Sequence, residues 1–150
     1  MRYLEDLSLG ETFACGNFSL SRAEIIAFAA QYDPQPFHLD EEAARASYFG
    51  TLCASGLHTQ GAAVGLMVRA IADVAVMAGY ALHEARFFTP VWPDVTYSVV
   101  ARWTSASPSP RDPTRGRATI AIEVAHGSDA VAALGVTYVV NRAPHVVSFP

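Results

Sequence analysis

The chain has 150 residues, of which 51% are apolar, and a formal net charge of −4 at pH 7. This length and composition predict one domain, spanning residues 1–150, with a core large enough to fold without disulfide or metal staples. The acidic balance argues against general nucleic-acid binding, which needs a basic face, and the absence of lysine excludes Schiff-base chemistry.

The cysteines and the most apolar segment indicate in which compartment the protein works and whether it enters a membrane. Cys15 and Cys53 lie far apart without zinc-site spacing, so we expect both to be reduced in a cytoplasmic protein. The first six residues lack the basic-then-apolar pattern of a signal peptide. Ser55 to Gly79 is apolar, but placing Arg69 or Asp73 in mid-bilayer would cost about 2.5–3.5 kcal/mol each. We therefore expect this segment to be a long buried helix, with no membrane as partner.

The N-terminal third predicts an extended segment and then a helix. Residues 7–20 carry glycine breaks between short apolar stretches, which favours extended structure with turns. Ser21 and Glu24 have the spacing of a capping box ahead of an apolar helical stripe. That helix must end near Asp33, because Pro34 disfavours the helical conformation in the residue before it.

A proline-rich segment separates this helix from a shorter one. Residues 33–39, Asp-Pro-Gln-Pro-Phe-His-Leu, are expected to form a rigid loop, because prolines suit neither a helix interior nor a central strand. Asp40 has the features of an N-cap, and its helix is expected to reach about Ser47. A second loop then leads to the long apolar helix.

Four extended segments follow, at about residues 83–91, 95–103, 120–124 and 131–140. Between the second and the third, residues 105–116 contain three prolines, which predicts an exposed, mobile loop. A helix segregated to one face of an antiparallel sheet is an α+β arrangement.

Asp33 and His38 are the first candidates for chemistry. A carboxylate and an imidazole on a proline-stiffened turn can together handle one water molecule, one group taking a proton and the other supplying one. Adding water across the double bond of an acyl thioester needs such a pair. Each residue also has an ordinary interpretation, Asp33 as the end of a helix and His38 as a satisfied histidine.

Ser55 and Gly56, at the start of the long helix, are the second candidates. The first N–H groups of a helix have no internal partner, and with the helix dipole they can hold a developing negative charge. The Gly56 N–H is thus a candidate oxyanion donor, and glycine lets a substrate approach closely. The ordinary alternative is an N-cap by Ser55 followed by a flexible glycine.

The segment beginning at Asp33 resembles the MaoC-like acyl dehydratases, which include the R-specific enoyl-CoA hydratases and whose motif runs roughly D-x-N-P-x-H-x-D-E. Five positions match it: Asp33, Pro36, His38, Asp40 and Glu41. Gln35 stands where asparagine is usual. Further similarity lies in Phe49-Gly50 with residues 54–57, and in residues 86–93. Asp94-Val95 stands where Gly-Asp is usual, so we expect a local change in that turn.

The resemblance implies a hotdog fold, in which a curved antiparallel sheet wraps a long central helix. It implies that Asp33 and His38 are the catalytic pair of a hydratase or dehydratase, a carbon–oxygen lyase, and that Gly56, beside Ser55, binds the thioester oxygen. The implied substrate is a 2-enoyl or 3-hydroxyacyl thioester of coenzyme A or an acyl carrier. No metal or prosthetic group is implied. The expected assembly is a homodimer or a larger homo-oligomer.

Two other functions stay open at this point. A hotdog acyl-CoA thioesterase would carry its carboxylate on the central helix, where the sequence offers only Asp73, late in the helix, with His58 and Gln60 near the start. A non-catalytic acyl-CoA-binding module would keep the fold without turnover. The apolar tail after Pro144 is expected either to pack on a neighbour or to lack fixed structure.

Overall fold

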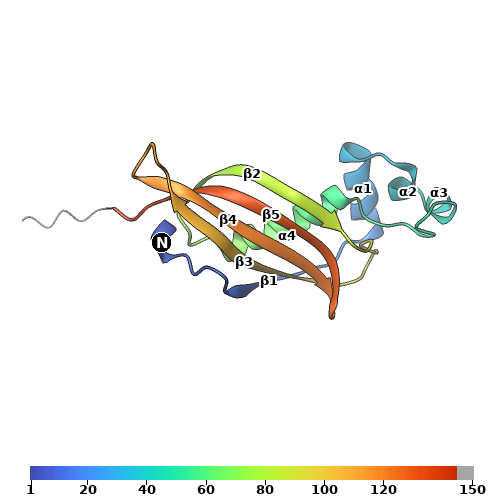
Figure 1. Cartoon of the computed structure of the whole chain (residues 1–150). Helices are drawn as coiled ribbons and strands as arrows, with labels where there is room; N and C mark the ends of the chain where they lie inside the picture. Colours follow the sequence, from blue (N-terminus) through green and yellow to red (C-terminus); the bar gives the residue numbers. More distant parts are fainter. Residues whose placement is uncertain (145–150) are drawn as a thin grey trace, which may run out of the picture.

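Five antiparallel strands form one curved sheet in the computed structural model, which describes residues 1–144 (Figure 1). The strands lie in the order β1-β3-β4-β5-β2. Their bounds are β1 Thr12–Phe18, β2 Val76–Phe87, β3 Tyr97–Pro108, β4 Arg115–His126 and β5 Asp129–Asn141. The three inner strands β3, β4 and β5 are joined by hairpins, whereas β1 and β2 form the two edges.

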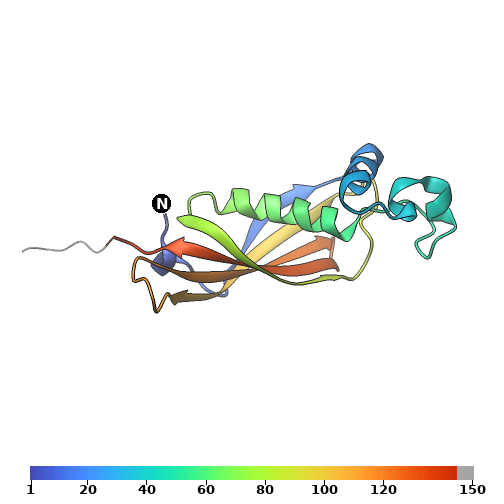
Figure 2. The same cartoon turned by 90° about the horizontal axis from the view of Figure 1, so that it is seen from above.

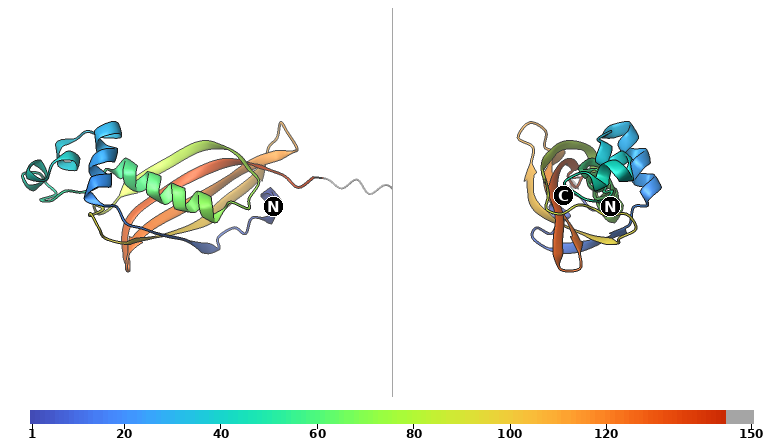
Figure 3. Two further views of the ribbon diagram at one scale, coloured as in Figure 1. Left: turned by 180° about the vertical axis from the view of Figure 1, so that it is seen from behind. Right: turned by 90° about the vertical axis from the view of Figure 1, so that its right-hand side faces the viewer.

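The central helix α4, Gly56–Ala70, lies in the concave face of the sheet. The sheet curls around it, as the end-on view of Figure 3 shows. Alternate residues of the inner strands point at the helix and are almost completely buried, as the pattern of β4 illustrates. Their contacts include Ala63 and Met67 of α4 and Ile120, Ile122 and Trp103 of the sheet. The expected α+β hotdog architecture is confirmed.

Three further helices project beyond one end of the sheet, next to the N-terminus of α4 (Figure 2). They are α1 Arg22–Tyr32, α2 Pro36–Leu39 and α3 Glu41–Arg45, and a short 3-10 helix, η1 Leu4–Asp6, lies near the other end of the molecule. The predicted capping box at the start of α1 is present, because Ser21 accepts from the Glu24 N–H while Glu24 accepts from the Ser21 N–H. Asp40 caps α3 as predicted, accepting from the Ala43 N–H at 2.8 Å.

The long apolar segment is not one helix to Gly79, so that prediction is wrong. Helix α4 ends at Ala70, and the chain turns into β2 at Val76, seven residues before the expected strand start. Strand β2 pairs with β5, beginning at Val76 opposite Val140. This long-range pairing satisfies backbone groups that a longer helix would have satisfied internally.

Smaller differences occur at both proline-rich segments. Residues 36–39 form the short helix α2 with Pro36 in its first turn, where a missing N–H costs nothing, rather than a loop. The expected loop at residues 105–116 narrows to residues 109–114, because β3 and β4 extend as a long hairpin. Helix α3 ends at Arg45.

The turn at Asp94 keeps the conformation that glycine favours. Asp94 has φ 61°, and its N–H donates to the Leu20 carbonyl at 2.8 Å. Aspartate is one of the few side chains that tolerate this left-handed region. The substitution of the usual Gly-Asp pair therefore places a side chain in a left-handed turn. The apolar tail after Pro144 lies outside the described residues. Within residues 1–144, no helix is long and apolar enough to span a membrane.

Candidate active site

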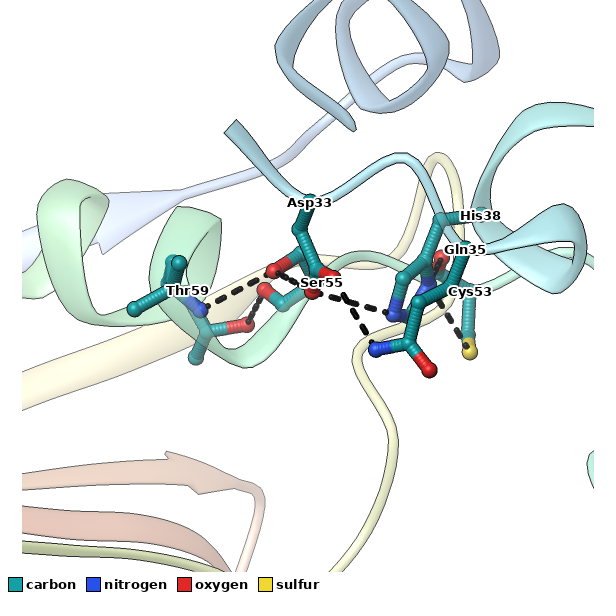
Figure 4. Close-up of polar contacts among 7 residues, drawn as sticks. Asp33, Gln35, His38, Cys53, Ser55 and Thr59 are labelled. Atoms are coloured by element: carbon teal, nitrogen blue, oxygen red, sulfur yellow. Dashed lines mark hydrogen bonds and ion pairs between the residues drawn. The ribbon is translucent and has the colours of Figure 1, made fainter. Parts of the chain in front are cut away.

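Asp33 ends α1 and turns its carboxylate toward the start of α4. Its Oδ2 accepts from the Ser55 hydroxyl at 2.6 Å, and its Oδ1 accepts from the Gln35 side-chain amide at 2.9 Å (Figure 4). The Ser55 hydrogen bond, followed by that of Gln35, holds the pKa of the Asp33 carboxyl below its usual range. Burial opposes these two bonds, and the nearby His38 adds a smaller lowering effect. Asp33 is thus a carboxylate built to stay ionised.

His38 lies on α2, and its buried ring is held by a hydrogen bond to the backbone. Its Nδ1 lies 2.7 Å from the Cys53 carbonyl oxygen, which can only accept, so Nδ1 carries a proton. In the neutral ring Nε2 is then an acceptor, and it faces Asp33 Oδ2 at 3.6 Å. Phe37 packs edge-on against the ring, with centroids 4.6 Å apart. The structure therefore brings the two predicted acid–base residues together.

Ser55 is completely buried and joins the acid–base pair to the central helix. As the N-cap of α4 it accepts from the Leu57 N–H at 3.1 Å while donating to Asp33. Its hydroxyl is therefore occupied on both sides within the protein. A direct role of Ser55 in substrate binding stays a prediction, whereas its contact with Asp33 is part of the structure.

Gly56 begins α4, and its N–H has no hydrogen-bond partner among residues 1–144. A Cβ at this position would lie 2.8 Å from the ring of Phe87, so the ring packs directly on the glycine. Glycine allows this close contact, and a larger residue here would require the Phe87 ring, which is 48% exposed, to shift. An unpartnered N–H at a helix N-terminus is suited to donate a hydrogen bond to the oxygen of a polarised carbonyl.

The pair and the helix start open into one cavity of about 640 Å³. Its walls are largely apolar and come from α2, the loop before α4, and the end of β2 with the residues that follow. They include Phe37, Phe49, Leu57, Phe87, Phe88 and Val91. Asp33 and His38 also line this cavity. A mostly apolar pocket with a few convergent polar groups is the usual form of a small-molecule site.

Cys53 contributes its carbonyl, and its thiol is a poor nucleophile. The thiol lies 3.8 Å from His38 Nδ1, and burial raises its pKa to about 11, so it stays protonated. Both cysteines are free thiols. In the described part of the chain, no three His, Cys, Asp or Glu side chains gather in a way that would hold a metal ion.

The residues considered for a thioesterase lie elsewhere. Asp73 follows the end of α4 and forms an exposed ion pair with Arg2, at 2.7 Å. His58 stacks flat on Phe28, with centroids 4.3 Å apart, and burial lowers its pKa. Neither residue lines the cavity that holds Asp33 and His38, and nor does Gln60.

Three contacts of the site were not predicted from the sequence, and one of them is the hydrogen bond from the Ser55 hydroxyl to Asp33. The Gln35 amide was noted only as a replacement for asparagine, although its place two residues after Asp33 permits the hydrogen bond that forms. The Cys53 carbonyl carries no side-chain signal, and its partnership with His38 follows from the fold alone.

Comparisons with known proteins agree with this geometry. A family model described as MaoC like domain matches residues 9–127. YdeM of Bacillus subtilis (strain 168) is 30% identical over 92 residues, which cover 61% of this chain and 65% of that protein. Protein MaoC of Klebsiella aerogenes is 32% identical over 99 residues, which cover 65% of this chain and 29% of that protein. The chain thus spans less than two thirds of both relatives. The crystal structure of the MaoC-like dehydratase from Rhodospirillum rubrum has 35% sequence identity and a TM-score of 0.85, covering 96% of this chain and 99% of that one.

Proposed function

Because the chain belongs to the MaoC-like dehydratase family, we propose that it is an enoyl-CoA hydratase or acyl dehydratase that adds or removes water at an acyl thioester. The observation that carries this proposal is the approach of Asp33 Oδ2 to His38 Nε2, 3.6 Å apart in a largely apolar cavity. Both atoms are acceptors, so one water molecule donating a hydrogen to each would be oriented by the pair.

The two residues take different parts in hydration. The hydrogen bonds that keep Asp33 ionised make it a weak base, so it orients the water, and His38 Nε2 takes the proton. The water oxygen forms its bond to the β-carbon while the double-bond electrons move toward the thioester oxygen. The imidazolium, paired with the Asp33 carboxylate, then gives its proton to the α-carbon. Dehydration follows the same steps in reverse.

The thioester oxygen gains negative charge in this reaction, and we propose that the Gly56 N–H donates a hydrogen bond to it. The Gly56 N–H lies at the positive end of the α4 dipole, and Gly56 lines the cavity that also holds Asp33 and His38. The carrier, coenzyme A or an acyl-carrier phosphopantetheine, enters as part of the substrate. No resident cofactor is needed for these steps.

The decisive experiment is loss of enoyl absorbance with purified protein and a panel of trans-2-enoyl-CoA thioesters. Asp33→Asn and His38→Ala should each be at least about 100-fold slower, the loss expected on removing a general acid–base group. Wild-type protein that hydrates none of the thioesters would refute the proposal. Release of free thiol would then favour a thioesterase, and binding without turnover an acyl-CoA-binding module.

Self-association is proposed at the β2 edge. Strand β2 has β5 on one side and no strand on the other in the described structure. Its exposed apolar side chains continue onto α4: Met77, Tyr80, Leu82 and Phe87 from β2, with Leu57 and Val68 from α4. An open edge flanked by large apolar side chains favours pairing with a second copy, giving a homodimer or a larger assembly.

The oligomeric state can be tested at Leu82, whose side chain is 64% exposed. Leu82→Lys should convert the assembly to monomers in light scattering after size exclusion, because a charge on an edge blocks pairing. Leu9→Lys, at an apolar residue 53% exposed outside β2 and α4, is the matched control and should leave the mass unchanged. A monomeric wild-type protein would overturn this part of the proposal.

A further inference from the structure

The contact between Gln35 and Asp33 joins two side chains separated by one residue. The Gln35 N–H donates to the Asp33 carbonyl at 2.7 Å, which folds the backbone back at Pro34. The Gln35 side chain then reaches Asp33 Oδ1 with its amide nitrogen at 2.9 Å. A carboxylate only accepts, so the nitrogen end of the amide must face it. Figure 4 shows the amide nitrogen of Gln35 pointing at the Asp33 carboxylate.

The two oxygens of Asp33 are thereby given separate tasks. Oδ1 is held by Gln35, and Oδ2 is held by Ser55 and faces His38 Nε2. Without a donor on Oδ1, only the Ser55 hydrogen bond would hold the carboxylate, and its plane could tilt about its last bond, away from His38. Gln35 is exposed, so its order comes from this hydrogen bond rather than from packing.

We propose that Gln35 is a positioning residue, which fixes the Asp33 carboxylate so that Oδ2 faces His38 and the reacting water. This inference deepens the proposed function and rests on it. Side-chain length is central to it. Asparagine, usual here in the family this chain resembles, is shorter by one carbon–carbon bond, roughly 1.5 Å, and its amide would fall short of Oδ1 on this backbone. The glutamine is thus the residue that suits this loop.

The electrostatic surroundings of Asp33 agree with this role. Among residues 1–144, the titratable side chain that acts on Asp33 is His38 of α2, while α1 and α4 present no charged group to it and α4 contributes the Ser55 hydroxyl. Gln35 stabilises the ionised form, so its removal should raise the pKa of the Asp33 carboxyl. A rise in the pKa of Asp33 on removing the amide would show that the amide is hydrogen-bonded to the carboxylate, whereas a side chain that only packs nearby would leave this pKa unchanged.

The test compares four variants by two independent measurements. Gln35→Met keeps the length without a donor, Gln35→Asn keeps the amide without the length, and Gln35→Glu places a second carboxylate beside Asp33. Gln31→Ala, on the exposed face of α1, is the control at the same residue type. The measurements are the carbon-13 NMR titration of the Asp33 carboxyl and the steady-state kinetics of enoyl-CoA hydration.

We expect Gln35→Met and Gln35→Asn to move the Asp33 titration to higher pH, and Gln35→Glu to move it further. Their kcat should fall between about 10- and 100-fold with little change in KM, as for a misplaced catalytic group. Unchanged titration and kcat in Gln35→Met would overturn the proposal. The NMR titration needs no turnover, so wild-type protein without hydratase activity would refute the proposed function and still leave the Gln35 contact decided.

Discussion

Replacing Ser55 with alanine removes the two hydrogen bonds of its hydroxyl, one to the Leu57 N–H and one to Asp33. The change removes the N-cap of α4, which costs about 1 kcal/mol. It also removes a partly buried hydrogen bond to a carboxylate, a contact of about 1.5–3 kcal/mol. The sum, about 2.5–4 kcal/mol, corresponds to a fall in Tm of about 5–16 °C for a domain of this size. Ser21→Ala is the exposed control, because the Ser21 hydroxyl also caps a helix and donates to a carboxylate, that of Glu24, but at a site where water can replace the lost hydrogen bonds; it should cost only about 1 kcal/mol.

The stability that Ser55→Ala removes should depend on pH, because part of it comes from the hydrogen bond to Asp33. Asp33 has a lower pKa in the folded protein than in the unfolded chain, chiefly because of Ser55. The stability that this provides is present above the ordinary aspartate range and is lost as the pH falls through the folded pKa. The stability gap between wild type and Ser55→Ala should therefore be full at neutral pH and shrink in acid. Urea unfolding across pH measures it, and an equal, pH-independent loss in both variants would refute the reasoning.

Three further outcomes are expected. Gly56→Ala should lower the free energy of unfolding in urea by about 1–2 kcal/mol, because the new Cβ meets the Phe87 ring. The loss should be clearly smaller when Phe87 is also replaced by alanine, and equal losses in the two backgrounds would argue against that contact. Asp94→Ala should lower the stability by about 1 kcal/mol in thermal unfolding, whereas Asp94→Gly should not lower it. If Asp94→Gly proved less stable than Asp94→Ala, the left-handed turn would carry no strain. Cys53 should resist a disulfide reagent at pH 8 in the folded protein and react fully in denaturant, whereas rapid labelling when folded would contradict its burial.

The features predicted correctly from the sequence are those with local causes. The capping box of Ser21 and Glu24 spans four residues, and so does the cap at Asp40, so both are readable from spacing. The Asp33–His38 approach was also expected, because the prolines between them limit the backbone.

The errors fall where distant residues decide the structure. Residues 71–79 are apolar and rich in alanine, which suits a helix, but Val76 pairs with Val140 at the far end of the chain. The donation from Ser55 to Asp33 likewise joins positions 22 residues apart. Spacing along the chain cannot reveal such contacts, because they depend on how the sheet closes around α4.

The attachment of α1 and α2 to α4 constrains how substrate reaches the site. Asp33 is tied to the first turn of α4 through Ser55, and His38 is tied through the Cys53 carbonyl just before it. Swinging these helices away to admit substrate would break the same hydrogen bonds that orient the acid–base pair. We therefore expect the ligand of this cavity to enter while α1 and α2 keep their place, so that any widening of the entrance would come from the other walls, near Phe49 and residues 87–91.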